Sequence, residues 1–365
     1  MKKRVLVLSK YPRMGASSRL RTLQYLPVLE RQGFEFTVSS LVDNAYLDRL
    51  YNDGSRSKLA VSRYYTKRLI TLSSVWRYDL VWIEGEVFPY LPALAERFLA
   101  FIGKDYIVDY DDAIFHNYDS SNNFVLRNFL AKKIDVVMRK SSCVIVGNDY
   151  LAKRAKMAGA EYIEQVPTVI DQTRYMPRPK AKVEGSPKVI GWIGSPSTQK
   201  YILDIKEALY TVSERHSVRL LLVGATQDIV DKLPSIEVEV VPWSENSETQ
   251  LIQQMDIGIM PLPDGPWEKG KCGYKLIQYM ASSVPVIASP VGVNVDIINN
   301  SDCGYLANDI VQWSKSLDLL LSSTAQREKF GKAGRRAVEE TYSLQVQVTI
   351  LEKIFNLINR SKPAL

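Results

Sequence analysis

Short apolar runs alternate with helix-patterned segments along the whole chain, and this alternation is the strongest constraint on its fold. The apolar runs of the first half are Val5–Ser9, Glu35–Ser39, Leu80–Ile83, Tyr106–Asp109 and Val144–Val146. Those of the second half are Val189–Ile193, Arg219–Val223, Val238–Val241, Ile257–Met260 and Val286–Ala288. Runs of this length bounded by turn residues are typical of buried parallel strands. Strands that alternate with helices predict doubly wound α/β domains.

The length of 365 residues exceeds the size at which one hydrophobic core usually stops growing, so two domains are expected. A polar, proline-rich linker over 179–187 is expected to separate a Rossmann-like domain at 1–178 from a second one at 188–342. The spacing of apolar residues predicts helices over Ser18–Gln32, Ile202–Glu214 and Glu248–Gln254. In the remaining segment, 343–365, a final helix over roughly Leu344–Ile358 either closes the second domain or crosses back to the first.

Composition excludes several classes of protein. No run of about 18 uncharged apolar residues is present, so no membrane span is expected. Three widely spaced cysteines suit a reducing cytoplasm and match neither a disulfide framework nor a metal site. With His116 and His216 as the only histidines, we expect no metal site and no cofactor. The loop Lys10–Arg19 has a single glycine, which argues against a dinucleotide-dependent oxidoreductase.

The net charge of +7 is concentrated in Tyr46–Tyr78, where basic residues alternate with aromatic ones. This segment is either a solvated helical face or a surface that meets anionic lipid headgroups. The sequence has no recognised nucleic-acid-binding module, so nucleic acid is not an expected partner.

A glycine-bearing loop runs directly into an amphipathic helix at Lys271–Ala281. Gly273 and Tyr274 lie at the start of this helix, between Lys271 and Lys275. Helix N-termini favour anions because their backbone N–H groups and the helix dipole point at the ligand. A second strand-to-helix loop, at Gly194 and Ser195, offers small residues and backbone donors. Both loops predict phosphate binding in the second half.

Five segments in order resemble GT-B glycosyltransferases of the retaining family-4 type, the group 1 glycosyltransferases. They are Val166–Pro177, Gly191–Pro196, Leu221–Gly224, Asp256–Pro261 and Lys271–Pro285. The resemblance implies two Rossmann-like domains that face a cleft. It further implies a nucleotide diphosphate sugar donor bound mainly by the second domain, an acceptor held by the first, retention at the anomeric carbon and no required metal.

The chain departs from that family's pattern at the phosphate and sugar contacts. Ser195 stands where the family usually has an arginine, and Lys200 falls near the position of its lysine. Gly270 and Gln278 occupy the positions of the usual glutamate pair. An amide at Gln278 can still bind a ribose hydroxyl. Glu268, or else Asp264, is a candidate to hold a sugar hydroxyl, and each is alternatively a carboxylate that faces water. Lys271 and Lys275 either replace the missing arginine or are surface lysines.

Further candidates come from both halves. Gly15 and Arg19 resemble the family's first glycine loop, which faces the donor phosphates, and Arg21 is interpreted as structural. Trp243 follows a strand and either stacks on a base or packs in the core. Asp111 and Asp112 are candidate bases for an acceptor hydroxyl, and alternatively they form a helix cap or an acidic surface turn. His116, four residues after Asp112, is a candidate site residue and alternatively a neutral loop histidine. Glu86 is a weaker candidate.

The hypothesis from sequence is a cytoplasmic glycosyltransferase, working at the inner face of the membrane, that builds a surface polysaccharide such as lipopolysaccharide. Its acceptor is expected to be a saccharide or a lipid-linked saccharide, with the lipid in contact with Tyr46–Tyr78. Two alternatives stay open: a nucleotide-sugar hydrolase or epimerase of the same fold, and a non-catalytic nucleotide-sugar-binding protein.

Overall fold

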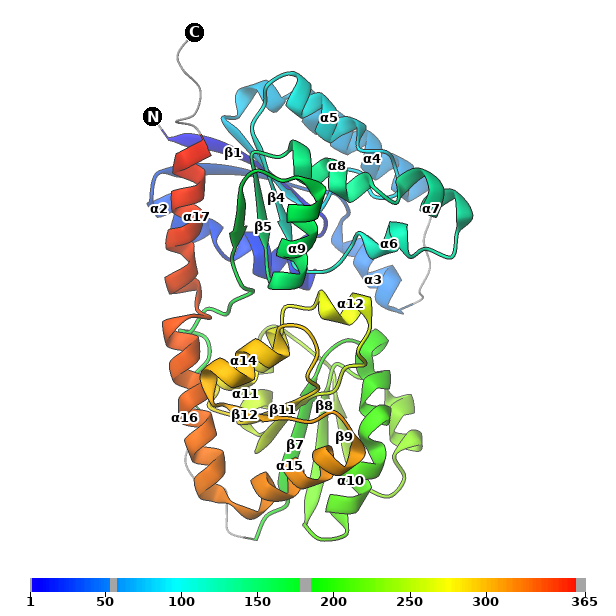
Figure 1. The fold of residues 1–365 in the computed structure, drawn as a ribbon, viewed down its shortest axis with the longest axis vertical. Coiled ribbons are helices and arrows are strands. Elements are labelled where there is room, and N and C mark those ends of the chain that lie inside the picture. The colour runs from blue at the N-terminus through cyan, green and yellow to red at the C-terminus, as the bar shows by residue number, and fades with distance from the viewer. Residues whose placement is uncertain (1, 53–57, 178–184, 359–365) are drawn as a thin grey trace. The chain divides into compact units, whose positions relative to one another are not determined.

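The computed structural model describes residues 2–52, 58–177 and 185–358 as two compact units (Figure 1). The first unit comprises Met1–Thr168 and Gln347–Leu365, and the second comprises Val169–Val346. The boundary at Thr168 precedes the segment 179–187 that the sequence suggested as a linker, of which residues 179–184 lie outside the described part.

The first unit contains a six-stranded parallel sheet in the order β2-β1-β3-β4-β5-β6. Its strands are β1 (Lys3–Ser9), β2 (Phe34–Ser40), β3 (Leu80–Glu84), β4 (Tyr106–Tyr110), β5 (Cys143–Val146) and β6 (Ile163–Gln165). β3 and β4 are buried along their whole length, as expected for a parallel sheet covered on both faces. Of these strands, the sequence missed only the edge strand β6, which is three residues long and only partly buried.

The helices of the first unit connect successive strands. They are α1 (Ala16–Ser18), α2 (Leu26–Arg31), α3 (Asn44–Asn52), α4 (Lys58–Ser73), α5 (Leu94–Phe101), α6 (His116–Asp119), α7 (Phe124–Leu130), α8 (Lys133–Lys140) and α9 (Asp149–Ala158). The single helix expected over Ser18–Gln32 is wrong: a π-helix, Arg19–Leu23, separates α1 from α2. Pro27 lacks the N–H group that would continue the helical ladder, so a new helix begins at its first turn.

The last helix, α17 (Leu344–Ile358), joins the first unit from Gln347 onward. Phe355 packs edge-on against Phe34 and Trp82, with ring centroids 5.5 and 5.1 Å away. The C-terminal helix therefore completes the core of the N-terminal sheet.

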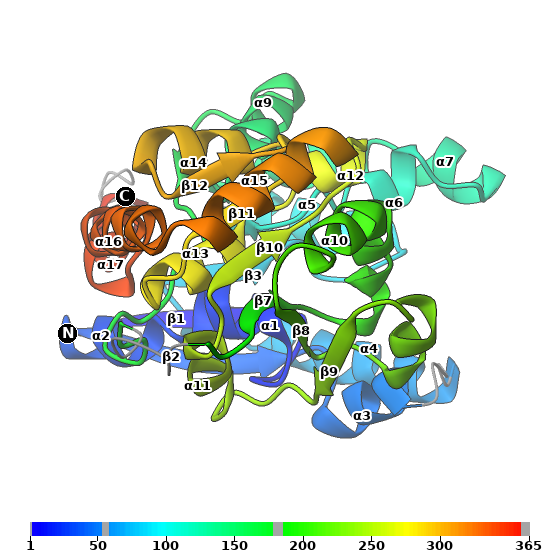
Figure 2. The same ribbon diagram turned by 90° about the horizontal axis from the view of Figure 1, so that it is seen from below.

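The second unit repeats the design with the order β12-β11-β10-β7-β8-β9, which Figure 2 shows from below. Its strands are β7 (Lys188–Ile193), β8 (Val218–Val223), β9 (Glu237–Val241), β10 (Ile257–Met260), β11 (Val286–Ala288) and β12 (Gly304–Leu306). Neighbouring strands are parallel. Successive residues contribute to opposite faces: Leu221 belongs to one hydrophobic core and Leu222 to the other. Of these six, the edge strand β12 was not predicted.

The helices of the second unit are α10 (Lys206–Ser213), α11 (Glu248–Gln253), α12 (Pro266–Lys269), α13 (Tyr274–Ala281), α14 (Asn294–Ser301), α15 (Ile310–Ser322) and α16 (Thr324–Glu340). The helix expected over Ile202–Glu214 is in fact two elements, because a 3₁₀-helix over Pro196–Ile205 precedes α10. No helix within the described residues is both long and apolar enough to cross a bilayer.

Candidate functional site

The carboxyl ends of β7, β8 and β9 bring three sequence-predicted loops to one edge of the second sheet. Gly194 follows β7, Gly224 follows β8 and Trp243 follows β9 by two residues. Gly224 has a φ of +79°, and a Cβ there would lie 2.3 Å from the carbonyl oxygen of Gly194 and 3.2 Å from Cβ of Trp243. Only glycine tolerates this combination, so the backbones approach each other closely at the edge where ligands of such sheets bind.

Lys275 extends from the first turn of α13 to the same place. Its Nζ lies 4.5 Å from the ring centre of Trp192, and a Cβ on Gly194 would be 2.9 Å from it. Within the part of the chain that the structure describes, no carboxylate pairs with this ammonium. Burial, and to a lesser extent the charge of Lys271, lowers its pKa to about 7. A bound anion would supply the missing counter-charge.

Backbone donors surround that position. The N–H groups of Ser195, Ser197 and Lys275 have no acceptor among the described residues. Gly273 caps α13 in the left-handed region, with a φ of +65°, and a Cβ there would lie 2.4 Å from Cδ1 of Ile297. The helix N-terminus therefore begins at a position that only glycine fits, and cation and donors together form an anion site.

The remaining predicted donor residues lie around this edge with different surroundings. Lys271 places Nζ 5.3 Å from the ring centre of Trp267, next to α12. Lys200 is exposed, and its Nζ lies 5.4 Å from the Tyr201 ring. The Tyr201 hydroxyl donates to Oε1 of Glu268 at 2.7 Å, which ties α12 to the 3₁₀-helix. Glu268 thus has a fixed orientation, whereas Lys200 faces solvent. Tyr274 is partly buried beside Lys275.

Gln278 belongs to a buried network that the sequence did not reveal. Its Nε2 donates to the Tyr175 hydroxyl at 3.1 Å and to Oε2 of Glu248 at 3.3 Å. Glu248 also accepts from that hydroxyl at 2.7 Å and from Nε1 of Trp243 at 2.8 Å. A carboxylate from α11 therefore lies beside the position where the family pattern has glutamate. Glu248 gave no signal in sequence because it reads as the ordinary first residue of an amphipathic helix.

In the first unit, the loop after β1 is a tight turn stabilised by buried groups. A Cβ on Gly15 would lie 2.3 Å from Cβ of Tyr11. The Arg19 guanidinium is buried and donates to the carbonyl oxygens of Arg13 and Met14 at 3.2 and 3.4 Å. Arg19 is thus fixed against its own loop.

Arg21, interpreted as structural, forms a buried ion pair with Asp109 at 2.8 Å. The same guanidinium donates to the Val166 carbonyl oxygen at 2.8 Å. This arginine ties the π-helix to β4 and to the segment that leaves the first unit.

Glu84, at the end of β3, is a buried carboxyl that sequence reasoning missed in favour of Glu86. It accepts from the Lys10 N–H at 3.0 Å and from the Ser18 hydroxyl. Burial, with a smaller contribution from the charge of Asp111, raises its pKa to about 7. Asp111 and Asp112 themselves are partly buried in the turn after β4. Glu84 could have been suspected from a carboxylate at the end of a fully apolar strand.

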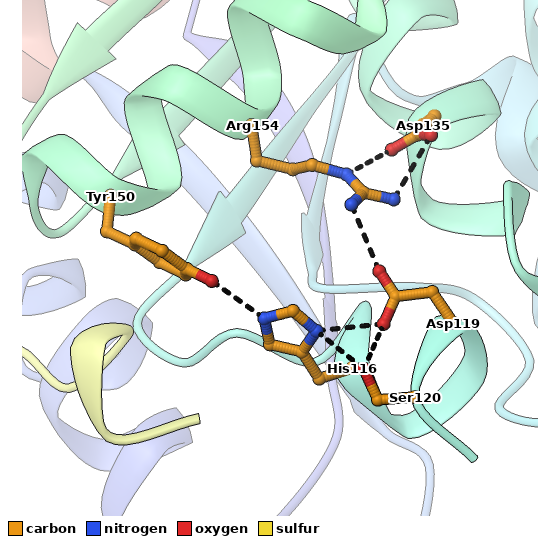
Figure 3. A network of polar contacts seen from close by, with 6 residues as sticks. All are labelled: His116, Asp119, Ser120, Asp135, Tyr150 and Arg154. Carbon is orange, nitrogen blue, oxygen red and sulfur yellow. Dashed lines mark hydrogen bonds and ion pairs between the residues drawn. The ribbon is translucent and has the colours of Figure 1, made fainter. Parts of the chain in front are cut away.

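His116 begins α6 and lies in the polar network of Figure 3. Its Nδ1 is 2.8 Å from Oδ1 of Asp119, and its Nε2 is 2.9 Å from the Tyr150 hydroxyl. The Arg154 guanidinium forms ion pairs with the carboxylates of Asp119, at 3.0 Å, and Asp135, at 2.6 Å. Both ring nitrogens of His116 are therefore engaged, and the network holds α6 against α8 and α9.

The basic segment Tyr46–Tyr78 is partly at the surface, although Arg56 and Asp53 lie outside the described residues. The apolar side chains of Leu69, Ile70 and Trp76 are exposed, and the same segment carries exposed cations such as Lys67. Arg68, in contrast, is buried and donates to the Ser9 and Ser39 carbonyl oxygens at 2.7 and 3.0 Å. No group of three or more His, Cys, Asp or Glu that could hold a metal occurs in the described ranges.

Comparison with known proteins identifies the second unit. Residues 187–323 match the family described as "Glycosyl transferases group 1". The capsular polysaccharide biosynthesis glycosyltransferase CapM of Staphylococcus aureus is 26% identical over 178 residues, which are 46% of each chain. The chain spans less than two thirds of the length of the curated relatives that it matches.

Solved structures share the fold over nearly the whole chain. Sucrose-phosphate synthase from Thermosynechococcus elongatus superposes with a TM-score of 0.75 at 13% identity, covering 99% of this chain and 100% of that one. Anabaena HepE, solved in complex with UDP-glucose, has a TM-score of 0.69 at 16% identity and covers 98% and 99%. These likenesses establish the arrangement of strands and helices within each unit.

Proposed function

We propose that the chain is a group 1 glycosyltransferase with the GT-B fold, because residues 187–323 match that family and the fold is shared with solved structures over nearly the whole chain. On this premise it transfers a sugar from a nucleotide diphosphate sugar to a saccharide acceptor. The observation that carries the proposal is the Lys275 ammonium beside Gly194, at the edge where several backbone N–H groups meet. Among the residues that the structure describes, this ammonium has no carboxylate partner and these N–H groups have no acceptor. The likeness to a capsule-building enzyme supports a role in surface polysaccharide synthesis, with a saccharide or lipid-linked acceptor.

In the proposed reaction, the bond between the anomeric carbon and the diphosphate oxygen breaks and a bond to the acceptor oxygen forms. The electron pair leaves with the diphosphate, where Lys275, Lys271 and the N–H groups near Ser195 would stabilise the added negative charge. The acceptor hydroxyl releases its proton, for which Asp111 and Asp112 remain the proposed carboxylates. We propose retention of configuration without a metal, as the family resemblance implies.

Other residues would orient the donor. The Trp243 indole N–H donates to Glu248, and the proposed role of the ring is to stack on a base at the sheet edge. Glu268, held by Tyr201, is the proposed ligand of a sugar hydroxyl. Gln278 now has a different proposed part: it positions the Glu248 carboxylate next to the ribose side of the site.

The experiment that tests the proposal measures nucleotide release. A thermal-shift screen of nucleotide sugars, starting with UDP-glucose because HepE was solved with it, first identifies the donor. Nucleotide release from that donor is then followed with and without candidate acceptor saccharides. Release that requires an acceptor supports the transferase. Equal release without an acceptor indicates a hydrolase, and binding without any release indicates a non-catalytic nucleotide-sugar-binding protein.

We also propose that the protein works in the cytoplasm against the inner face of the membrane, through the exposed part of Tyr46–Tyr78. Exposed Leu69, Ile70 and Trp76 near Lys67 give that surface both apolar and cationic contacts. Co-sedimentation with liposomes should rise with the content of anionic lipid, and should fall when Lys67 and Trp76 are replaced by Ser. Absence of binding to either liposome would contradict this part of the proposal.

A further inference from the structure

A pocket in the first unit is lined by thirteen residues, six of them tyrosines. Its volume is about 270 Å³, and its aromatic lining consists of Tyr11, Tyr46, Tyr64, Tyr65, Tyr90 and Tyr118. Glu86 and Asn117 are also part of the lining. Three of these tyrosines come from the segment Tyr46–Tyr78, so part of that segment faces a pocket as well as the solvent.

Tyr90 is held at this pocket in an unfavourable conformation. Its φ is +60°, in the left-handed region that a bulky residue seldom occupies. The ring stays half-exposed, 5.8 Å from the Tyr118 ring, and the backbone N–H donates to the Tyr118 hydroxyl at 3.0 Å. Strain of this kind persists where surrounding structure imposes it, and it gathers at ligand sites. Here it presents an aromatic face to the pocket.

The rest of the wall is fixed by hydrogen bonds. The hydroxyls of Tyr64, Tyr65 and Tyr118 donate to Asp43 at 2.6 Å, to the Pro89 carbonyl oxygen at 2.5 Å and to Glu86 at 2.8 Å.

Tyr118 and Asn117 lie on α6, the helix that the His116 network of Figure 3 ties to Tyr150 and Arg154. This network gives α6 a definite position, and with it two of the pocket's side chains. The pocket is thus preorganised, which lowers the entropic cost of binding.

Several polar groups at the wall still lack partners. Within the described part of the chain, the hydroxyls of Tyr46 and Tyr90 and the side-chain amide of Asn117 make no hydrogen bond. Aromatic faces beside free hydroxyl and amide groups suit a sugar ring, which has a C–H face and a rim of hydroxyls. A hydrocarbon chain would cover these polar groups without satisfying them, which is unfavourable.

We propose that this tyrosine pocket binds one sugar ring of the acceptor saccharide, with Tyr90 stacked on the ring and Asn117 bonded to its hydroxyls. The inference rests on the proposed function and specifies it: the pocket recognises the saccharide part of the acceptor, and any lipid part lies elsewhere.

Saturation-transfer NMR on the full chain tests the proposal, with methyl glycosides of glucose, galactose, mannose and N-acetylglucosamine as probes. At least one glycoside should show transfer to its ring protons. Tyr90→Ala and Asn117→Ala should each weaken its affinity about two- to tenfold, whereas Tyr90→Phe should keep most of it because the ring remains. Tyr162→Ala, which removes a partly buried tyrosine of the same unit that is not part of the pocket lining, is the matched control.

Three results would overturn the inference. They are the absence of transfer to every glycoside, affinities that the pocket substitutions leave unchanged, and binding of farnesyl phosphate that these substitutions weaken instead. If Tyr90→Ala fails to fold, the glycoside affinities of Asn117→Ala and Tyr90→Phe still test the inference.

Nucleotide-sugar binding, measured by thermal shift on the same variants, separates this inference from the proposed function. It should be unaffected by Tyr90→Ala. Glycoside binding without any nucleotide-sugar binding would remove the proposed function and leave a saccharide site, and the converse would remove only the pocket's assignment.

Discussion

Lys275 should make donor binding depend on pH near neutrality. Burial, with Lys271 beside it, lowers the pKa of the free protein's Lys275 to about 7, well below the ordinary value for lysine. A bound diphosphate stabilises the charged form and raises this pKa. The gain in affinity from the ammonium is therefore fully present below about pH 7, and it is lost as pH rises through the pKa of the complex.

The size of this change in affinity follows from the binding of one proton to Lys275. Each pH unit between the two pKa values changes the affinity up to about tenfold. From about pH 7 to about pH 8.5 the dissociation constant should thus rise by up to roughly fifteenfold, because half of the free protein's Lys275 is already deprotonated at about pH 7. A nucleotide sugar is a suitable ligand because each of its phosphates carries a single, strongly acidic group, so its own charge is constant over this range.

Lys275→Met removes both the charge and the titration. Loss of one charge-assisted hydrogen bond should weaken donor binding by about 1.5–3 kcal/mol, or roughly ten- to 150-fold, at about pH 6.5. Isothermal titration calorimetry should find this variant's weak affinity nearly independent of pH. Lys206→Met, which changes an exposed lysine on α10, is the control. Wild-type affinity in Lys275→Met, or a wild-type affinity that is flat with pH, would refute the reasoning.

Three further substitutions test the packing, and urea unfolding is the measurement for each. Gly224→Ala places a Cβ at a positive φ and against a carbonyl oxygen, so it should lower the free energy of unfolding by about 3 kcal/mol and abolish donor binding. Gly33→Ala, which has a positive φ but open space around it, should lower the free energy of unfolding by about 1 kcal/mol. Gln278→Glu restores the family residue but places a second carboxylate against Glu248, so the free energy of unfolding should fall by about 3 kcal/mol. Adding Glu248→Gln should recover most of this loss. An unchanged free energy of unfolding in Gln278→Glu would contradict the network. Because the pKa of Glu84 is raised to about 7, its contribution to stability is present below about pH 4 and is lost as pH rises through about 7. Glu84→Gln should therefore have a free energy of unfolding up to about 3 kcal/mol higher than that of the wild type between about pH 5 and pH 8.

The sequence predicted the strands better than the helices, for a physical reason. The ten strands it indicated are all present, and those in the sheet interiors leave a continuous apolar signal because they are covered on both faces. β2 and β9 were also predicted, although they lie at sheet edges and are only partly buried. The missed strands, β6 and β12, are three residues long and lie at sheet edges, where burial is partial. The helical segments at Ser18–Gln32 and Ile202–Glu214 broke into π- and 3₁₀-helical pieces that apolar spacing does not distinguish from α-helix.

The candidate site was predictable where local chain geometry creates it. Gly194, Gly273 and Lys275 are adjacent to strand or helix ends, so their place at the sheet edge follows from the order of elements. Glu248 reaches Gln278 across some thirty residues, through side-chain contacts that no local pattern encodes. The strain at Tyr90 and the tyrosine pocket likewise depend on loops that meet only in the folded unit.

A crystal structure of the protein with its nucleotide diphosphate tests the central claim most directly. We expect the diphosphate to lie at the carboxyl edge of the second sheet, within hydrogen-bond distance of Lys275 Nζ and of the N–H groups of Ser195 or Ser197. A diphosphate bound elsewhere, with Lys275 still stacked on Trp192 and without an anion, would contradict it.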